Sequence, residues 1–248
     1  MASLARQAQT VTAISLNWRY SPACQTTWRA IREGQIGRLL DIRTEWRGRS
    51  SPRLAPWSTG GALREAGSHE FDRARFLTGW DFKRAVCSLT GAGAAGTVPA
   101  DTSAFVTAEM SDRRLGSLRL SMTPGEPERR ITLCGEEGTL ALSAEWVTIG
   151  QGDATMTLSN EVRVFRQRAD DADPVSLEIA ESDRQPPDVL SGQHTWNRLI
   201  ADFVSAVRRG DVQHQSVPHL PHVSDGLATQ EVIAACELSH AERRWVDL

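Results

Sequence analysis

The sequence predicts an α+β fold in which one large, mostly antiparallel open sheet carries helices packed on one face. Short segments of alternating apolar and polar residues follow one another across residues 103–165, with turn residues between them, which is typical of antiparallel strands. Helical periodicities flank this region, and an antiparallel sheet can bury one face under helices while the other stays open. We find no internal repeat and no linker, so we expect a single domain over residues 1–248.

The expected elements before residue 103 are a helix end at 3–9, a strand at 11–18, a helix at 21–33, a strand at 40–46, one helix at 57–79 and a strand at 82–89. Ser21 and Pro22 suit the start of the second helix, because a hydroxyl can cap it and proline is tolerated at the first helical position. Gly79 is a natural end for the long helix, and Ser58 or Thr59 can cap its start.

The expected strands after residue 103 cover 104–110, 117–122, 131–134, 139–142, 147–149, 155–158 and 162–165. Residues 167–188 are acidic and poor in large apolar side chains, so we expect a surface loop there. Apolar residues recur every three or four positions over 195–209, which predicts a helix. Ser224 is the expected cap of the last helix, 225–241, and the tail 244–248 is an expected edge strand.

Composition narrows the function classes. The formal net charge is −3 and the arginines are scattered among acids, so nothing indicates nucleic-acid binding. No run approaches the ~20 apolar residues that a membrane span needs. The four cysteines lack C-x-x-C spacing, which argues against a zinc site. With no signal peptide recognised, we expect a cytoplasmic protein that binds neither a membrane nor a metal.

The central segment 57–79 also carries the candidate chemistry. Glu65 and His69 are four residues apart, so a continuous helix would place them on one face, and Asp72 extends that face. An imidazole between two carboxylates can take up and release a proton near neutral pH. The alternative is an ordinary solvated pair, and Asp72 has the alternative of an ion pair with Arg73 or Arg75.

Aromatic and histidine residues supply further candidates. Trp18, Trp46 and Trp57 fall near the segments singled out above; they either pack in the core or form an aromatic wall for an apolar or ring-bearing ligand. His194 begins a predicted helix and is a candidate substrate contact. His219 and His222 are three apart, but no third ligand is evident, which favours loop histidines over a metal site.

Several stretches, in order, resemble the C-terminal half of the Gfo/Idh/MocA oxidoreductases. T-G-G-A-L-R-E-A-G-S-H-E-F-D at 59–72 is similar to the family signature G-G-G-x-x-x-D-x-G-x-H-x-x-D. The other matching stretches are L-N-W-R-Y-S-P at 16–22, I-R-E-G-Q-I-G-R-L-L at 31–40, C-G-E-E-G-T-L at 134–140, S-D-G-L-A at 224–228 and R-W-V-D-L at 244–248. The resemblance covers nearly the whole chain.

The resemblance implies a substrate site on the signature helix. In the family, the acid and the histidine of the signature bind the hydroxyls of a sugar or polyol and help to move its proton; here they correspond to Glu65 and His69. Glutamate in place of aspartate sets the carboxylate about one methylene further out. Arg19 lies in the family's arginine-containing turn and would hold an anionic or carbonyl group. The family's sheet often pairs with a second copy, which implies a homodimer or higher oligomer.

The family's nucleotide-binding half has no counterpart in these residues. The glycines of G-A-G-A-A-G-T-V-P at 91–99 lack the strand–turn–helix context of a phosphate cradle. The family's catalytic lysine is also unmatched, since the single lysine, Lys83, lies elsewhere. We therefore expect no cofactor to be bound by this chain alone, and NAD(P) only if a partner supplies the nucleotide-binding half.

Three functions follow from different classes. The first is a cofactor-independent acid–base enzyme, of cyclase, isomerase or lyase type, acting on a small molecule in biosynthesis; it uses His69 as proton carrier with help from Glu65. The second is the substrate-binding subunit of an NAD(P)-dependent sugar or polyol oxidoreductase whose Rossmann half is on another chain. The third is a non-catalytic homo-oligomeric scaffold.

Overall fold

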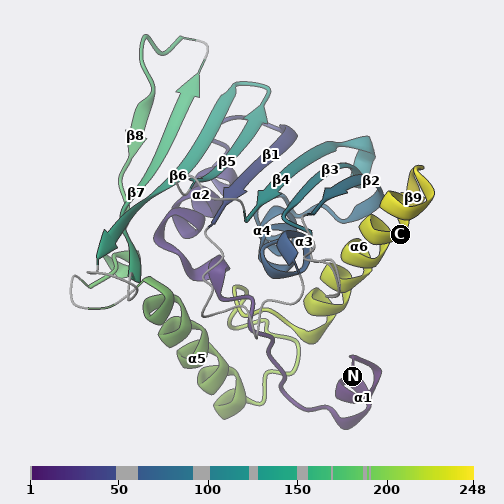
Figure 1. Ribbon diagram of the computed structural model, residues 1–248. Coiled ribbons are helices and arrows are strands. Elements are labelled where there is room, and N and C mark those ends of the chain that lie inside the picture. The colour runs from purple at the N-terminus through teal and green to yellow at the C-terminus, as the bar shows by residue number, and fades with distance from the viewer. Residues whose placement is uncertain are drawn as a thin grey trace.

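A computed structural model describes residues 2–48, 61–91, 101–122, 128–149, 156–168, 170–186, 189 and 191–248. Nine strands form one sheet in the order β8-β7-β6-β5-β1-β4-β3-β2-β9 (Figure 1). Their bounds are β1 Leu39–Arg47, β2 Phe82–Thr90, β3 Ser103–Met110, β4 Leu115–Ser121, β5 Glu128–Gly135, β6 Gly138–Ile149, β7 Met156–Arg168, β8 Val175–Leu177 and β9 Val246–Asp247. Among the described strands, β1 and β4 pair in parallel and the other neighbours pair antiparallel, as expected for this fold class.

The helices are α1 Ala2–Ala8, α2 Pro22–Arg32, α3 Gly61–Glu65, α4 Gly67–Thr78, α5 Ser191–Arg209 and α6 Val223–Glu242, with short 3-10 turns η1 Asn17–Tyr20, η2 Ser111–Arg113 and η3 Glu181–Asp183. Figure 1 shows α2, α3, α4 and α6 along one side of the sheet, whereas α5 lies farther from it. The core fills the space between these helices and the sheet. The prediction of helices on one face is confirmed.

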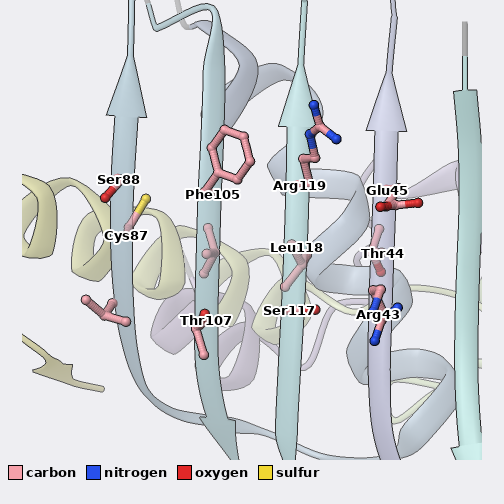
Figure 2. A pocket seen from close by; sticks show the side chains of 12 residues that line it. Arg43, Thr44, Glu45, Cys87, Ser88, Phe105, Thr107, Ser117, Leu118 and Arg119 are labelled. Carbon is pink, nitrogen blue, oxygen red and sulfur yellow. The ribbon is translucent and has the colours of Figure 1, made fainter.

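The strand alternation follows the sequence closely where both faces are described. In β3, Ala104, Val106 and Ala108 are buried under the helices, while Phe105 and Thr107 are exposed. Successive side chains of a strand point to opposite faces, so this pattern separates a core face from an open face. Figure 2 shows the open face, on which β1, β2, β3 and β4 bound a shallow groove of about 350 Å³.

Two strand predictions are wrong. Residues 11–16 pair with no described strand; the Ile14 amide instead donates to the Pro221 carbonyl (3.1 Å), and the chain then enters η1. The three short strands predicted over 147–165 belong to the long strands β6 and β7, which pair with each other from Gly138↔Arg168 to Ile149↔Met156. Pairing between β6 and β7 keeps both strands continuous through polar residues at which the apolar–polar pattern predicts an end.

The single helix predicted for 57–79 is wrong as well. Residues 49–60, including the expected caps, lie outside the described chain; the described part is two helices separated at Ala66. The His69 amide bonds to the Ala66 carbonyl (3.1 Å), three residues back, instead of to Glu65. At the other end the prediction holds, because Gly79 adopts φ 74° just beyond α4.

Two predictions near the C-terminus need correction. The stretch 167–188 contains β8 and η3, and Asp183 of η3 is buried rather than on the surface. The last helix, α6, is capped by His222, whose Nδ1 accepts from the Ser224 amide (3.2 Å). The predicted edge strand is confirmed, because β9 pairs with β2.

Candidate active site

His69 lies in the first turn of α4 and stacks on Trp18 of η1. The two ring centroids are 4.1 Å apart and the ring planes differ by 13°. Both side chains keep part of their surface open to solvent. His69 Nδ1 is buried and has no hydrogen-bond partner among the described residues. A buried polar atom of this kind is costly unless something bonds to it, so the position is suited to a ligand.

Two guanidinium groups lie against the same tryptophan. The Cζ atom of Arg129, from β5, is 4.0 Å from the Trp18 ring centroid, and that of Arg73, one turn beyond His69 on α4, is 5.4 Å from it. Arg73 is buried and forms an ion pair with buried Glu70. The cluster therefore combines aromatic stacking with concentrated positive charge.

Burial and this positive charge together keep His69 unprotonated. Burial, then Arg73, then Arg129 lower the pKa of His69 from 6.5 to about 3. Burial and Arg73 likewise lower the pKa of Arg129 to about 9, against an opposing contribution from Glu70. His69 is therefore a neutral imidazole at pH 7, able to donate from one ring nitrogen and accept at the other.

Glu65 does not join this cluster. It is exposed at the end of α3, and its carboxylate makes no hydrogen bond or ion pair with any residue in the described part of the chain. The expected pairing of Glu65 with His69 is wrong, because the helix is interrupted between them at Ala66. In this arrangement guanidinium groups, rather than carboxylates, are the charged neighbours of the imidazole.

Arg19 and Asp72 are engaged with each other. Arg19 Nε donates to Asp72 Oδ2 (2.7 Å), Arg19 Nη2 also pairs with Asp72, and it contacts Asp225 of α6 at 3.2 Å. Burial disfavours the charge on Arg19, yet the ion pair with Asp72 raises its pKa above the ordinary value. The contacts support the structural alternative for Asp72, with Arg19 rather than Arg73 or Arg75 as the partner, and they place Arg19 in the same structural pair.

The remaining sequence candidates divide between core and periphery. Trp46 is buried, and its ring stacks with that of Trp18 at a centroid distance of 6.5 Å, which agrees with the core-packing alternative. Trp57 lies outside the described residues. His194, at the start of α5, is buried beside Arg198, and burial followed by Arg198 lowers its pKa. Its helix meets η1 through the hydrogen bond from Asn17 Nδ2 to Thr195 Oγ1 (2.7 Å).

Sequence reasoning missed Glu70, Arg73 and Arg129. One signal was available for Arg129, because it is in phase with buried Ile131 and Leu133 of β5 and so belongs to the helix-covered face. Arg73 has a similar signal, since it lies one residue past Asp72 on a largely buried helix. Charged residues in phase with a core face are rare unless they are paired or functional.

The described residues contain no group of three or more His, Cys, Asp or Glu side chains that could hold a metal ion. Residues 92–100, which hold most of the glycine-rich stretch 91–99, lie outside the described chain. No helix in the described part is both long and apolar enough to cross a bilayer.

Comparison with known proteins gives a consistent result. A family model described as the C-terminal alpha/beta domain of an oxidoreductase family, Gfo/Idh/MocA, matches residues 29–248. Inositol 2-dehydrogenase of Rhizobium meliloti (strain 1021) is 26% identical in an alignment of 247 residues, and the match covers 95% of this chain and 64% of that protein. The chain thus spans less than two thirds of that relative.

Solved structures show the same fold. An oxidoreductase domain protein from Kribbella flavida is similar with a TM-score of 0.76 and 20% identity, over 99% of this chain and 69% of that one. An inositol dehydrogenase homolog from Azotobacter vinelandii, complexed with NAD+, gives 0.78 and 14%, over 99% and 67%. Levoglucosan dehydrogenase in complex with NADH and levoglucosan gives 0.74 and 20%, over 97% and 67%.

Proposed function

Because the chain belongs to the Gfo/Idh/MocA oxidoreductase family, as its C-terminal alpha/beta domain, we propose that it is the substrate-binding half of an NAD(P)-dependent sugar or polyol oxidoreductase. The nucleotide-binding half lies outside residues 1–248. The substrate class rests on relatives that act on inositol or bind levoglucosan. The role we propose for residues 1–248 is to bind and orient the substrate.

The observation that carries this proposal is the partly open His69–Trp18 stack with a buried, unpartnered Nδ1. Trp18 fixes the plane of the imidazole, and the depressed pKa keeps the ring neutral. A neutral imidazole bonds well to a hydroxyl group, as donor or as acceptor, depending on the tautomer. Arg129, beside the same ring, adds donors for a second substrate oxygen.

The cofactor-independent acid–base reaction is less well supported. It needs a proton carrier with a pKa near the working pH, whereas the pKa of His69 is about 3. It also assigns Glu65 a contact with His69, and the two side chains are not joined. The oxidoreductase proposal does not require this chain alone to supply a proton carrier with a pKa near the working pH, nor a contact between Glu65 and His69.

Replacing His69 by alanine is expected to weaken polyol binding about tenfold, a loss of ~1.4 kcal/mol. The variant removes the stacked ring and its free nitrogen but no charge. Binding of myo-inositol and levoglucosan to the 248-residue chain can be measured by isothermal titration calorimetry, with and without NADH. Arg184→Gln, at an exposed ion pair with Glu178, serves as the control. Unchanged binding in the His69 variant would remove this site from the proposal. Tight NADH binding by residues 1–248 alone would contradict the expectation that the nucleotide-binding half lies outside them.

We also propose that the open sheet face joins two copies of the chain. Figure 2 shows Arg43, Glu45, Phe105 and Arg119 around the groove on this face. The Phe105 side chain is 47% exposed, and the Arg119 guanidinium lies over its ring at 5.4 Å. In a two-fold interface the same patch meets itself, so a face carrying both charge signs around an aromatic residue is self-complementary.

Phe105→Lys is expected to convert such a dimer to monomer, because it removes the aromatic residue at the groove and adds a cation beside Arg119. Molar mass from size-exclusion chromatography with light scattering gives the result. Leu227→Lys on α6, where the leucine is 50% exposed, is the matched control and leaves the mass unchanged. A wild-type monomer, or a Phe105 variant that stays dimeric, would refute this interface.

A further inference from the structure

We propose that the substrate held at His69 and Trp18 carries a carboxylate, so that the preferred ligand is a sugar acid rather than a neutral polyol. This inference rests on the proposed function and narrows its substrate class. The position for the carboxylate is beside the Trp18 ring, around which the side chains of Arg129, Arg73 and His69 lie.

Three donor side chains lie around one aromatic ring. Arg129 and Arg73 come from β5 and α4, which are far apart in sequence, yet both guanidinium carbons lie within 5.4 Å of the Trp18 ring centroid. His69 stacks on the same ring. Guanidinium groups bind carboxylates through paired, charge-assisted hydrogen bonds, which a hydroxyl group cannot match. Trp18, His69 and Arg129 are all partly exposed, so a solute can reach the cluster.

Among the buried polar atoms of the cluster, Arg73 Nε, His69 Nδ1 and Glu70 Oε2 have no hydrogen-bond partner in the described chain. Arg73 has a side chain that is 4% exposed; it gives one nitrogen to Glu70, but its Nε donor has no hydrogen-bond partner in the described chain. His69 Nδ1 is in the same state. Arg73 Nε can only donate a hydrogen bond. Leaving this buried donor without an acceptor costs about 1–3 kcal/mol, and more for a charged group. An oxygen acceptor arriving with the ligand would remove that cost.

The electrostatics point the same way. Arg73 lowers the pKa of both His69 and Arg129, next after burial in each case. Glu70 opposes this at Arg129 but is itself engaged by Arg73. A ligand carboxylate in this low-dielectric position would interact with these guanidinium groups far more strongly than it does in bulk water.

D-glucuronate and D-glucose form a matched pair of probes, since they differ at C6 by a carboxylate against a hydroxymethyl group. We expect the chain to bind D-glucuronate about tenfold more tightly at low salt, measured by calorimetry, with the preference shrinking as salt rises. In Arg129→Gln the preference, which is the ratio of the two affinities, falls below about threefold. Arg129→Lys keeps the charge and most of the preference, and Arg184→Gln changes neither affinity.

The outcomes separate the two proposals. Equal affinity for the two probes, or a preference that survives Arg129→Gln in a folded protein, overturns the carboxylate inference. If D-glucose binding still depends on His69 in either case, the substrate-binding function stands without it. If neither probe nor the polyols bind, both proposals fail. Circular dichroism of each variant establishes that the fold is retained.

Discussion

Asp72→Ala is expected to lower the free energy of unfolding by about 3–5 kcal/mol. Asp72 is 1% exposed and accepts two bonds from Arg19, which is itself 5% exposed. Removing the carboxylate leaves a buried guanidinium whose remaining carboxylate contact, Asp225 at 3.2 Å, is more exposed. An uncompensated buried charge is among the few single changes with an effect of this size. Urea denaturation of the variant and the wild type measures it.

A matched exposed pair provides the control. Arg38 and Glu136 also form an ion pair, but both side chains are largely exposed, so Glu136→Ala is expected to cost under about 1 kcal/mol. The double variant Arg19→Met/Asp72→Leu removes both charges and is expected to recover most of the loss. If Asp72→Ala costs no more than Glu136→Ala, the buried pair does not hold this part of the fold.

The Arg19–Asp72 ion pair matters for the candidate site because it joins η1 to α4. Asp72 lies one turn after His69 on α4, and Arg19 follows Trp18 directly in η1. The ion pair therefore fixes α4 against η1 close to the point where His69 stacks on Trp18. Asp72, a sequence candidate for the substrate site, acts here on the position of the residues that we propose to face the ligand.

The elements predicted well are those whose signals are local. Pro22 after a capping serine, Gly79 after a helix and the strict alternation of β3 each depend on a few neighbouring residues. The elements predicted badly depend on partners. Residues 11–16 contain a strand-like alternation but have no described strand beside them, and β6 and β7 extend through polar residues because each supplies the other's hydrogen bonds.

The candidate site likewise has one part that local spacing predicts and another that depends on tertiary structure. The spacing in 59–72 singles out His69, and in the structure its ring stacks on that of Trp18. Its charged neighbours follow from tertiary structure, since Arg129 reaches it from β5 and no spacing rule connects the two positions. An unbroken helix predicts a Glu65–His69 pair; the helix is interrupted at Ala66, and the pair is not formed.

Acidification below pH 6.5 is expected to destabilise the protein through His69. Its pKa is 6.5 in the unfolded chain and about 3 in the folded one, so between these values the unfolded state binds a proton that the folded state does not. Stability is therefore full above pH 6.5 and falls as the pH drops, by at most ~1.4 kcal/mol per pH unit. Allowing for partial solvent access, we expect a loss of about 2 kcal/mol between pH 6.5 and 4.5.

His69→Gln isolates this contribution, because glutamine is polar and does not titrate. His194 and His219 also have lowered pKa values, with burial as the first cause, so some pH dependence persists in the variant and only the difference between the two curves is assigned to His69. Urea denaturation at half-unit pH steps gives both curves. Parallel curves would mean that His69 titrates near its ordinary pKa despite Arg73 and Arg129. The imidazole would then be a competent proton carrier at neutral pH. The lowered pKa of His69 would no longer argue against the acid–base reaction.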